Sequence, residues 1–598
     1  MIRERLEKLR QEMQENTIEY YIIPTGDYHL SEYDGEYFHA REYMSGFTGS
    51  AGTLVVGMKE AGLWTDGRYY IQAERQLKGS TITLYKQGSE GVPTVEEYLK
   101  SVLQKGENIG FDGKVMPAKM GCELESFVLE KGGNVLFDED LVGKIWEDRP
   151  LLSQEPAFLL EEKYAGESVD SKLSFVRAVM KEKNADFYLL SMLDDISWLL
   201  NIRGNDVACT PVILAYAVVT EQSVYLFADM RKFSIGLMEY FADCGVEIMP
   251  YEDIYSWLKD LPGGYHVMFD RERINYALYK SLPSRVKKID CENPTIDRKA
   301  RKNPVEVKNL KQAHIKDGVA VTKFIYWLKK NIGKIPISEL SAASYLEDCR
   351  REQEGYIEPS FDTISAYRSN AAMMHYSATP QSDVKLSPEG MLLVDSGGQY
   401  YEGTTDITRT IVLGPVSEEI RKQYTAVLRG MIRLADAKFL YGCTGLNLDI
   451  LAREPLWEMG LDYRCGTGHG VGYLLSVHEA PNGFRWKTVS GRDDRAVLEE
   501  GMVTSDEPGV YVEGSHGIRI ENELLCRKGE KNEYGQFMYF DTLTLVPIDL
   551  EAVDPQYMTQ YEIEWLNLYH QKVYHMLAPH LNEEERVWLR METREIGK

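Results

Sequence analysis

Two stretches in the C-terminal half repeat one another at a fixed separation, and this repeat constrains the fold more than any other feature. E-G-M-L-L-V-D-S-G-G-Q-Y-Y-E-G spans 389–403, and E-G-M-V-T-S-D-E-P-G-V-Y-V-E-G spans 500–514. The offset is a constant 111 residues, and eight of the fifteen positions are identical. Because self-similarity in a fixed order indicates a duplicated structural unit, we expect two strand-turn-strand copies related by a pseudo-twofold axis. Their acidic residues should face one cavity.

Both copies carry carboxylates where a strand meets a turn. The first copy offers Asp395 and Asp406 on the two arms of an expected β-hairpin, and the second offers Glu507 and Glu521 on equivalent arms. A carboxylate buried in an apolar strand is costly unless a cation pairs with it. Arg409 and Arg519 could each neutralise one carboxylate as a structural ion pair. Four carboxylates exceed that supply of positive charge.

The glycine-rich stretch G-T-G-H-G-V-G (466–472) adds an imidazole, His469, to the carboxylates. Four carboxylate charges balance two divalent ions, and shared oxygen ligands with one imidazole suit Mn²⁺, Co²⁺ or Zn²⁺. A water between two such ions becomes a nucleophile, so the implied reaction is hydrolysis. The glycines fit close backbone approach beside the metals and the substrate. A dinucleotide-binding loop is a weaker reading, because no acidic ribose partner follows and no strand-turn-helix unit surrounds the stretch.

The N-terminal half contains a fainter echo. Apolar, strand-like runs alternate with helix-like stretches, and both sections contain an Asp-x-Arg end, at Asp66 and Arg68 and again at Asp229 and Arg231. Alternation of this kind predicts layered α/β sheets. We therefore expect two related α/β domains at 1–155 and 156–301, and a third domain at 302–598.

Charge and composition exclude some partners. The formal net charge of −25 argues against nucleic acid, whose binding surfaces are basic. The N-terminal segment lacks a signal-peptide core, and the longest apolar run is far shorter than the ~20 residues that cross a bilayer. The eight cysteines are scattered without C-x-x-C pairs, as expected in a reducing compartment. We expect a cytoplasmic protein with neither a membrane nor a nucleic-acid partner.

Ordered motifs along nearly the whole chain resemble the aminopeptidase P family, the Xaa-Pro aminopeptidases of the pita-bread metallopeptidases. They include Y-M-S-G-F-T-G-S-A-G (43–52), A-H-I-K-D (313–317), P-S-F-D-T-I-S (359–365) and F-D-T-L-T-L-V-P-I (540–548). The resemblance, to the long cytosolic form, implies a mixed α/β (α+β) chain. Two creatinase-like α/β domains would precede a pita-bread catalytic domain with a C-terminal helical extension. It also implies a dimanganese site, a homodimer, and removal of the N-terminal residue from peptides with proline in second position.

Residue roles follow from the same resemblance. The implied metal ligands are Asp395, Asp406, His469, Glu507 and Glu521, with Asp406 and Glu521 bridging. Glu507 would also be the general base, supported by Tyr511 and Arg519. His375 and His478 match the family histidines that contact the substrate and the developing oxyanion or leaving nitrogen. Several family members have a further histidine where this chain has Cys465.

Alternatives remain at this point. A prolidase-like dipeptidase and a methionine aminopeptidase share the fold, although two N-terminal domains argue against the second. A non-catalytic binding module is the alternative outside enzymes, and it would have no reason to bury so much charge. Cys465 is either a small packed residue or a thiol near His478 with a reactive thiolate fraction.

Overall fold

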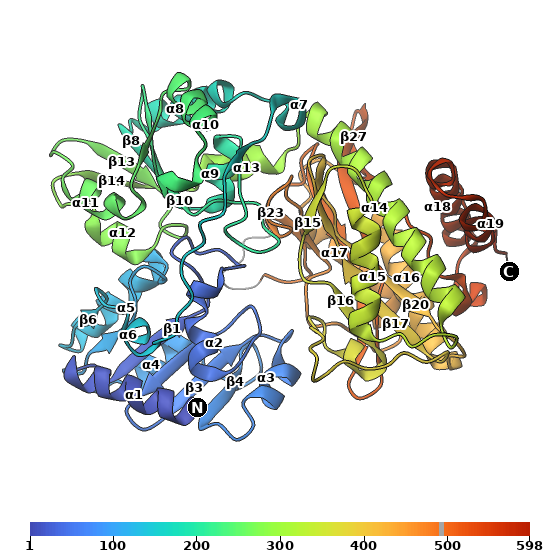
Figure 1. Ribbon diagram of the computed structural model, residues 1–598, viewed down its shortest axis with the longest axis horizontal. Coiled ribbons are helices and arrows are strands. Elements are labelled where there is room, and N and C mark those ends of the chain that lie inside the picture. The colour runs from blue at the N-terminus through green and yellow to red at the C-terminus, as the bar shows by residue number, and fades with distance from the viewer. Residues whose placement is uncertain (489–494, 598) are drawn as a thin grey trace. The chain divides into compact units, whose positions relative to one another are not determined.

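The computed structural model describes residues 1–488 and 495–597. The chain divides into two compact units (Figure 1). The first contains Met1–Glu161 and Glu167–Thr295, and the second contains Glu162–Gly166 and Ile296–Lys598. Within the described ranges, no helix is both long enough and apolar enough to cross a membrane.

The first unit contains two six-stranded sheets of the same topology. The strands of the first sheet are, in order, β4 (Ile82–Lys86), β3 (Ala61–Thr65), β2 (Thr53–Gly57), β1 (Tyr20–Pro24), β5 (Ile109–Gly110) and β6 (Val135–Leu136). Those of the second are β12 (Val246–Met249), β11 (Val224–Ala228), β10 (Ala215–Val219), β8 (Phe187–Leu190), β13 (His266–Phe269) and β14 (Lys287–Asp290). Both central strands, β1 and β8, pair antiparallel on one side and parallel on the other.

The Asp-x-Arg echo occupies equivalent places in the two sheets. Asp66 follows β3 and pairs with Arg68 at 2.8 Å, while Asp229 follows β11 and pairs with Arg231 at 2.6 Å. The predicted relationship between the two N-terminal halves is therefore confirmed. The boundaries at 155 and 301 stay predictions, because the two halves form one compact unit.

The second unit contains the sequence repeat. Its strands are β15 (Tyr356–Pro359), β16 (Ile364–Tyr367), β17 (Met391–Ser396), β18 (Gly398–Tyr400), β19 (Gly403–Thr404), β20 (Ile407–Val412), β21 (Lys438–Leu440), β22 (Gly468–Gly470), β23 (Glu479–Phe484), β24 (Val503–Asp506), β25 (Gly509–Val512), β26 (His516–Arg519), β27 (Asn522–Asn532) and β28 (Gly535–Thr542). In the first copy β17 pairs antiparallel with β20, and the pair β18-β19 lies between them in sequence. In the second copy β24 pairs antiparallel with β27, with the pair β25-β26 between them. The duplication predicted from the offset is thus a duplication of structure.

Each copy is covered by its own helices. α14 (Pro304–Asn331) and α15 (Glu339–Arg351) pack on β17 and β20, whereas α16 (Glu418–Ala435), α17 (Gly445–Trp457) and α18 (Gln560–Leu577) pack with β27 and β28. α14 begins where the sequence K-N-P-V-E supplies a start signal. Asn303 caps the helix, Pro304 occupies its first turn, and Glu306 completes a capping box. The charged segment that precedes residue 304 therefore leads directly into α14. The C-terminal part adds α19 (Glu583–Glu592).

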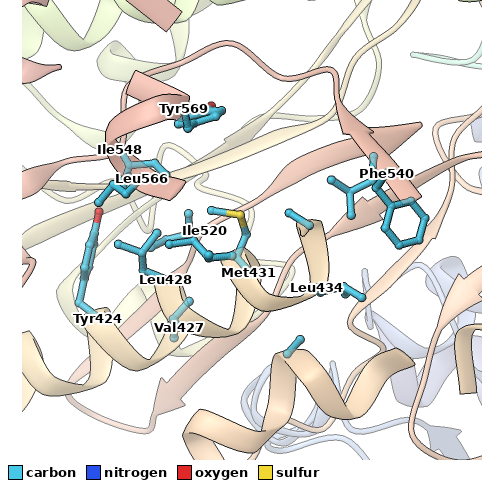
Figure 2. Packing of buried hydrophobic residues seen from close by; sticks show 14 of the residues in the cluster. Tyr424, Val427, Leu428, Met431, Leu434, Ile520, Phe540, Ile548, Leu566 and Tyr569 are labelled. Carbon is cyan, nitrogen blue, oxygen red and sulfur yellow. The ribbon is translucent and has the colours of Figure 1, made fainter. Parts of the chain in front are cut away.

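The apolar face of α16 forms the core beneath the second copy. Tyr424, Val427, Leu428, Met431 and Leu434 recur at the spacing of one helix face and are fully buried. Figure 2 shows this face packed with Ile520, Phe540 and Leu566. The second copy of the repeat therefore packs against the buried apolar face of α16.

Replacing Leu428 by alanine should destabilise the second unit. Leu428 is 0% exposed, and truncation of a wholly buried leucine costs about 2–5 kcal/mol. Urea unfolding should show a lower transition midpoint for Leu428→Ala, whereas Leu568→Ala, at a position on α18 that is 64% exposed, should change it little. Equal midpoints for the two variants would contradict the assigned core.

Candidate metal centre

The two copies of the repeat and strand β22 deliver acidic and imidazole side chains to one point. Asp406 lies just before β20, Glu521 just before β27, and His469 at the centre of β22. Ligand atoms of these three residues all lie within 4.8 Å of one another. The residues come from segments as much as 115 positions apart in sequence, so only the fold brings them together.

His469 presents one ring nitrogen to the carboxylates. Its Nε2 lies 3.4 Å from Asp406 Oδ2 and 3.5 Å from Glu507 Oε1. Its Nδ1 lies 2.9 Å from the carbonyl oxygen of Gly470. Since a carbonyl oxygen can only accept, Nδ1 carries the proton in this bond, and the neutral ring then has its lone pair on Nε2. A metal-binding histidine is oriented in this way.

The glycines around His469 allow β22 to lie against neighbouring backbone. A Cβ on Gly468 would stand 1.8 Å from the carbonyl oxygen of Ser505, and a Cβ on Gly470 would stand 2.2 Å from that of Glu479. No side chain fits at these distances. The predicted close approach of backbone to these glycines is therefore confirmed. At these two positions the approaching backbone belongs to the neighbouring chain segments of the protein itself.

Among the residues that the structure describes, Arg519 pairs with one carboxylate and Arg409 pairs with none. Arg519 donates to Asp395 Oδ2 at 2.5 Å and to the Tyr511 hydroxyl at 2.7 Å. The donors of Arg409 go instead to backbone carbonyls, an amide oxygen and a tyrosine hydroxyl: those of Thr408, Glu521, Val546, Pro547, Asn522 and Tyr569. The expectation that Arg409 forms an ion pair is wrong, because the strands place neutral acceptors around it.

The cluster carries more negative charge than the side chains around it can balance. Burial raises the pKa of Asp406 to about 7, against an opposing hydrogen bond from His469. Burial also raises the pKa of Glu507, and burial together with the neighbouring carboxylates raises that of Glu521 well above its ordinary value. Burial lowers the pKa of His469, but the bond to Asp406 and the charge of Glu507 outweigh it and bring the value to about 9.

Asp395 supplies a further donor atom. It is 8% exposed, and its Oδ1 has no hydrogen-bond partner among the described residues. An unsatisfied, buried carboxylate oxygen beside an acidic cluster is a fitting ligand for a hard divalent cation. The residues present therefore fit the predicted metal pair.

Hydroxyl groups that the sequence did not single out hold these carboxylates in place. Thr408 Oγ1 donates to Glu521 Oε2 at 2.7 Å. Ser505 Oγ accepts from the backbone N–H of His469 at 3.0 Å and donates to Glu507 Oε1 at 3.3 Å. Serine and threonine are ordinary residues of strands, so no sequence signal distinguished these two.

The register of the repeat differs from the expected equivalence. The offset of 111 aligns Asp395 with Asp506, while Glu507 aligns with Ser396. Asp506 is 0% exposed, and neither of its carboxylate oxygens has a hydrogen-bond partner within the described ranges. Asp506 ends β24, and Glu507, one residue beyond it, is the side chain that reaches His469. In the second copy, the carboxylate near His469 thus comes from Glu507, one residue after the position that aligns with Asp395.

The two other predicted histidines lie in different surroundings. The ring of His478 stands 4.2 Å from that of His469, centroid to centroid, in an edge-on arrangement. His375 is half-buried and comes after the short helix η4 (Arg368–Ala372). The carbonyl oxygen of the preceding residue, Met374, accepts from Arg519 Nη2 at 3.4 Å. The structure therefore places His478 beside His469. It connects the segment that contains His375 to Arg519 through the hydrogen bond at Met374.

Cys465 has surroundings that oppose a reactive thiolate. Burial and the charge of Glu507 raise the pKa of its thiol to about 11. Its carbonyl oxygen accepts from Arg453 at 2.7 Å, so the segment is fixed by its backbone. In the absence of metal ions these surroundings favour the neutral thiol, and the hypothesis of a reactive thiolate at Cys465 stays a prediction.

Comparison with known proteins gives a consistent result along the chain. The description "Metallopeptidase family M24" matches residues 308–528, and "Creatinase/Prolidase N-terminal domain" matches 5–131 and again 148–306. The probable Xaa-Pro aminopeptidase P of Paracoccidioides brasiliensis is 36% identical, with 99% of each chain covered. Aminopeptidase P2 of Arabidopsis thaliana is 37% identical over 97% of this chain and 86% of its own.

A solved structure is similar over the full length. The X-prolyl aminopeptidase of Caenorhabditis elegans, described as a cytosolic enzyme with a di-nuclear active site, is 33% identical, covers 100% of both chains and superposes with a TM-score of 0.94. The expected fold, two creatinase-type domains followed by a pita-bread domain, is confirmed by these matches. The chain therefore belongs to metallopeptidase family M24, and within it to the Xaa-Pro aminopeptidase P proteins.

Proposed function

We propose that this protein is a metal-dependent aminopeptidase that removes the N-terminal residue from peptides with proline in second position. The observation that carries the proposal is the convergence of Asp406, His469 and Glu521 within 4.8 Å in a chain of this family. Asp395 and Glu507 complete a set of five donors. Asp406 and Glu521 would be the bridging ligands, as the family resemblance implies.

Two bound divalent ions would supply a Lewis acid and a hydroxide nucleophile near neutral pH. Glu507 accepts the proton of the attacking water at its carboxylate, and its raised pKa brings it nearer to the working pH of a general base. Arg519, braced by the Tyr511 hydroxyl, holds Asp395 in place. The side chains of the protein would thus supply carboxylates in fixed positions and one proton acceptor, Glu507.

An Xaa-Pro bond makes particular demands on a peptidase. It is a tertiary amide without an N–H group, so a site that relies on that donor loses a contact. The leaving proline nitrogen must also receive a proton. His478, beside His469, and His375 are the proposed contacts for the substrate carbonyl and the leaving nitrogen.

The ligand types favour Mn²⁺ over softer metals, because four carboxylates face one imidazole nitrogen. Co²⁺ and Zn²⁺ are the alternatives. A cytoplasmic homodimer is the proposed state of the protein, on the strength of the family resemblance and of the C. elegans relative, which is described as cytosolic. Peptides with penultimate proline are the proposed partners.

The dependence of turnover on peptide length and on the second residue should distinguish an Xaa-Pro aminopeptidase from a prolidase and from a binding module. We expect turnover of Xaa-Pro-Yaa peptides with a free N-terminus and much slower turnover of Xaa-Ala-Yaa, measured by release of the first amino acid. Chelation should abolish this turnover, and Mn²⁺ should restore it. A preference for bare Xaa-Pro dipeptides would identify a prolidase, and binding without turnover would identify a binding module.

Glu507→Gln should separate metal binding from catalysis. The amide keeps an oxygen donor but cannot accept a proton, so turnover should fall by about 10²–10⁴-fold while part of the metal is retained. Metal content by elemental analysis and turnover at saturating peptide check both halves. Glu513→Gln, at an exposed position six residues further on, should leave both unchanged. Full turnover in Glu507→Gln would remove Glu507 from the mechanism.

A further inference from the structure

The motif A-H-I-K-D (313–317) belongs to α14 and is not explained by the metal ligands. Its two buried ionisable residues, His314 and Asp317, are each 3% exposed. Residues three positions apart lie on the same face of a helix, so both point to the same side of α14. Buried ionisable groups require partners, and the partners of these two lie in different copies of the repeat.

His314 reaches the second copy. Its Nε2 lies 3.3 Å from Glu523 Oε1, and its Nδ1 lies 2.8 Å from the carbonyl oxygen of Leu310, one turn earlier. Glu523 is 0% exposed and comes two residues after the proposed ligand Glu521. The imidazole is therefore held by its own helix, and its Nε2 lies at ion-pair distance from one carboxylate.

The same carboxylate contacts the first copy. Glu523 Oε1 accepts the backbone N–H of Asp406 at 2.7 Å. The backbone N–H of Glu523 donates to Thr544 Oγ1 at 2.8 Å, which fixes the strand from the other side. One oxygen atom thus joins the imidazole of α14 to the backbone of a proposed bridging ligand.

Asp317 makes a parallel connection. It accepts from Arg350 Nε at 2.7 Å and from the Tyr400 hydroxyl at 2.9 Å. Arg350 Nη2 also donates to Ser396 Oγ at 3.1 Å, and Ser396 directly follows the ligand candidate Asp395. The helix therefore contacts both copies close to their carboxylates. The connection through His314 leads to the backbone N–H of Asp406, a proposed ligand, whereas the connection through Asp317 leads to the side chain of Ser396.

We propose that His314 is a positioning residue of the metal centre, which acts by pairing with Glu523 so that Glu523 fixes the backbone of Asp406. The inference rests on the proposed ligand role of Asp406. Without the imidazole, Glu523 would be a buried carboxylate with one N–H donor and no positive partner. It would shift, and Asp406 would lose its fixed direction. Groups behind a metal ligand of this kind typically contribute 10–100-fold to metal affinity.

The test measures Mn²⁺ affinity directly, by titrating chelator-stripped, folded protein with Mn²⁺ alone. We expect His314→Gln to raise the Mn²⁺ dissociation constant by about 10-fold or more. Glu523→Gln, which preserves shape, should do the same, and the double variant should be no weaker than the weaker single variant, because both remove one connection. Turnover at saturating Mn²⁺ should return to within a few fold of the unchanged protein.

His570→Gln is the matched control. His570 is another wholly buried histidine of this unit, on α18, and its Nε2 accepts the backbone N–H of Ile548 at 3.1 Å. Its replacement should lower the melting temperature without weakening Mn²⁺ binding. An equal loss of Mn²⁺ affinity in His570→Gln would show a general effect of core damage and would overturn the proposal.

Asp406→Ala separates this inference from the proposed function. If Asp406→Ala binds Mn²⁺ as tightly as the unchanged protein, the ligand assignment itself fails. If Asp406→Ala loses Mn²⁺ but His314→Gln and Glu523→Gln bind it within twofold of normal, only the positioning role is refuted. Should His314→Gln fail to fold, the isosteric Glu523→Gln decides the question by the same titration.

Discussion

The second unit is organised around buried negative charge that its own side chains do not balance. Asp406 and Glu521 are at most 5% exposed, and within the described part of the chain Arg519 pairs with one carboxylate of the cluster, Asp395. Such an arrangement is costly in a protein interior unless cations enter it. Two divalent ions, held by these residues, would resolve the cost and would supply hydrolytic chemistry at the same point. Burial, together with this charge, accounts for the raised pKa values of the cluster carboxylates.

Rigid backbone packing determines where that charge sits. The glycines of β22 bring the backbone beside His469 against its neighbours, where any Cβ would collide with a carbonyl oxygen. The first copy of the repeat is covered by α14 and α15 and the second by α16, α17 and α18, and α14 reaches both copies through His314 and Asp317. Ligand geometry in this unit is thus a property of strands and helices, which hold side chains more firmly than loops do.

Much of this was predictable, for reasons that can be stated residue by residue. A repeat at constant offset survives in the sequence because each copy must form the same strands, so Asp395, Asp406 and Glu521 could be placed on equivalent arms. Family motifs assigned His375 and His478 and the order of domains. One expectation failed and one shifted: Arg409 is surrounded by neutral acceptors, and Asp506 takes the position equivalent to Asp395. Each depends on which way a side chain points, which periodicity alone does not determine.

The sequence by itself determined the duplicated unit, the kinds of donor atoms and the family, because these are properties of residue type and spacing along the chain. The tertiary structure alone decided which donors converge and which ring nitrogen of His469 lies near the carboxylates. It also decided that α14 participates, since His314 and Glu523 are separated by 209 positions and meet only after the helix packs on its strand. Contacts between distant segments depend on chain path and side-chain direction, and neither quantity is recorded in local sequence patterns.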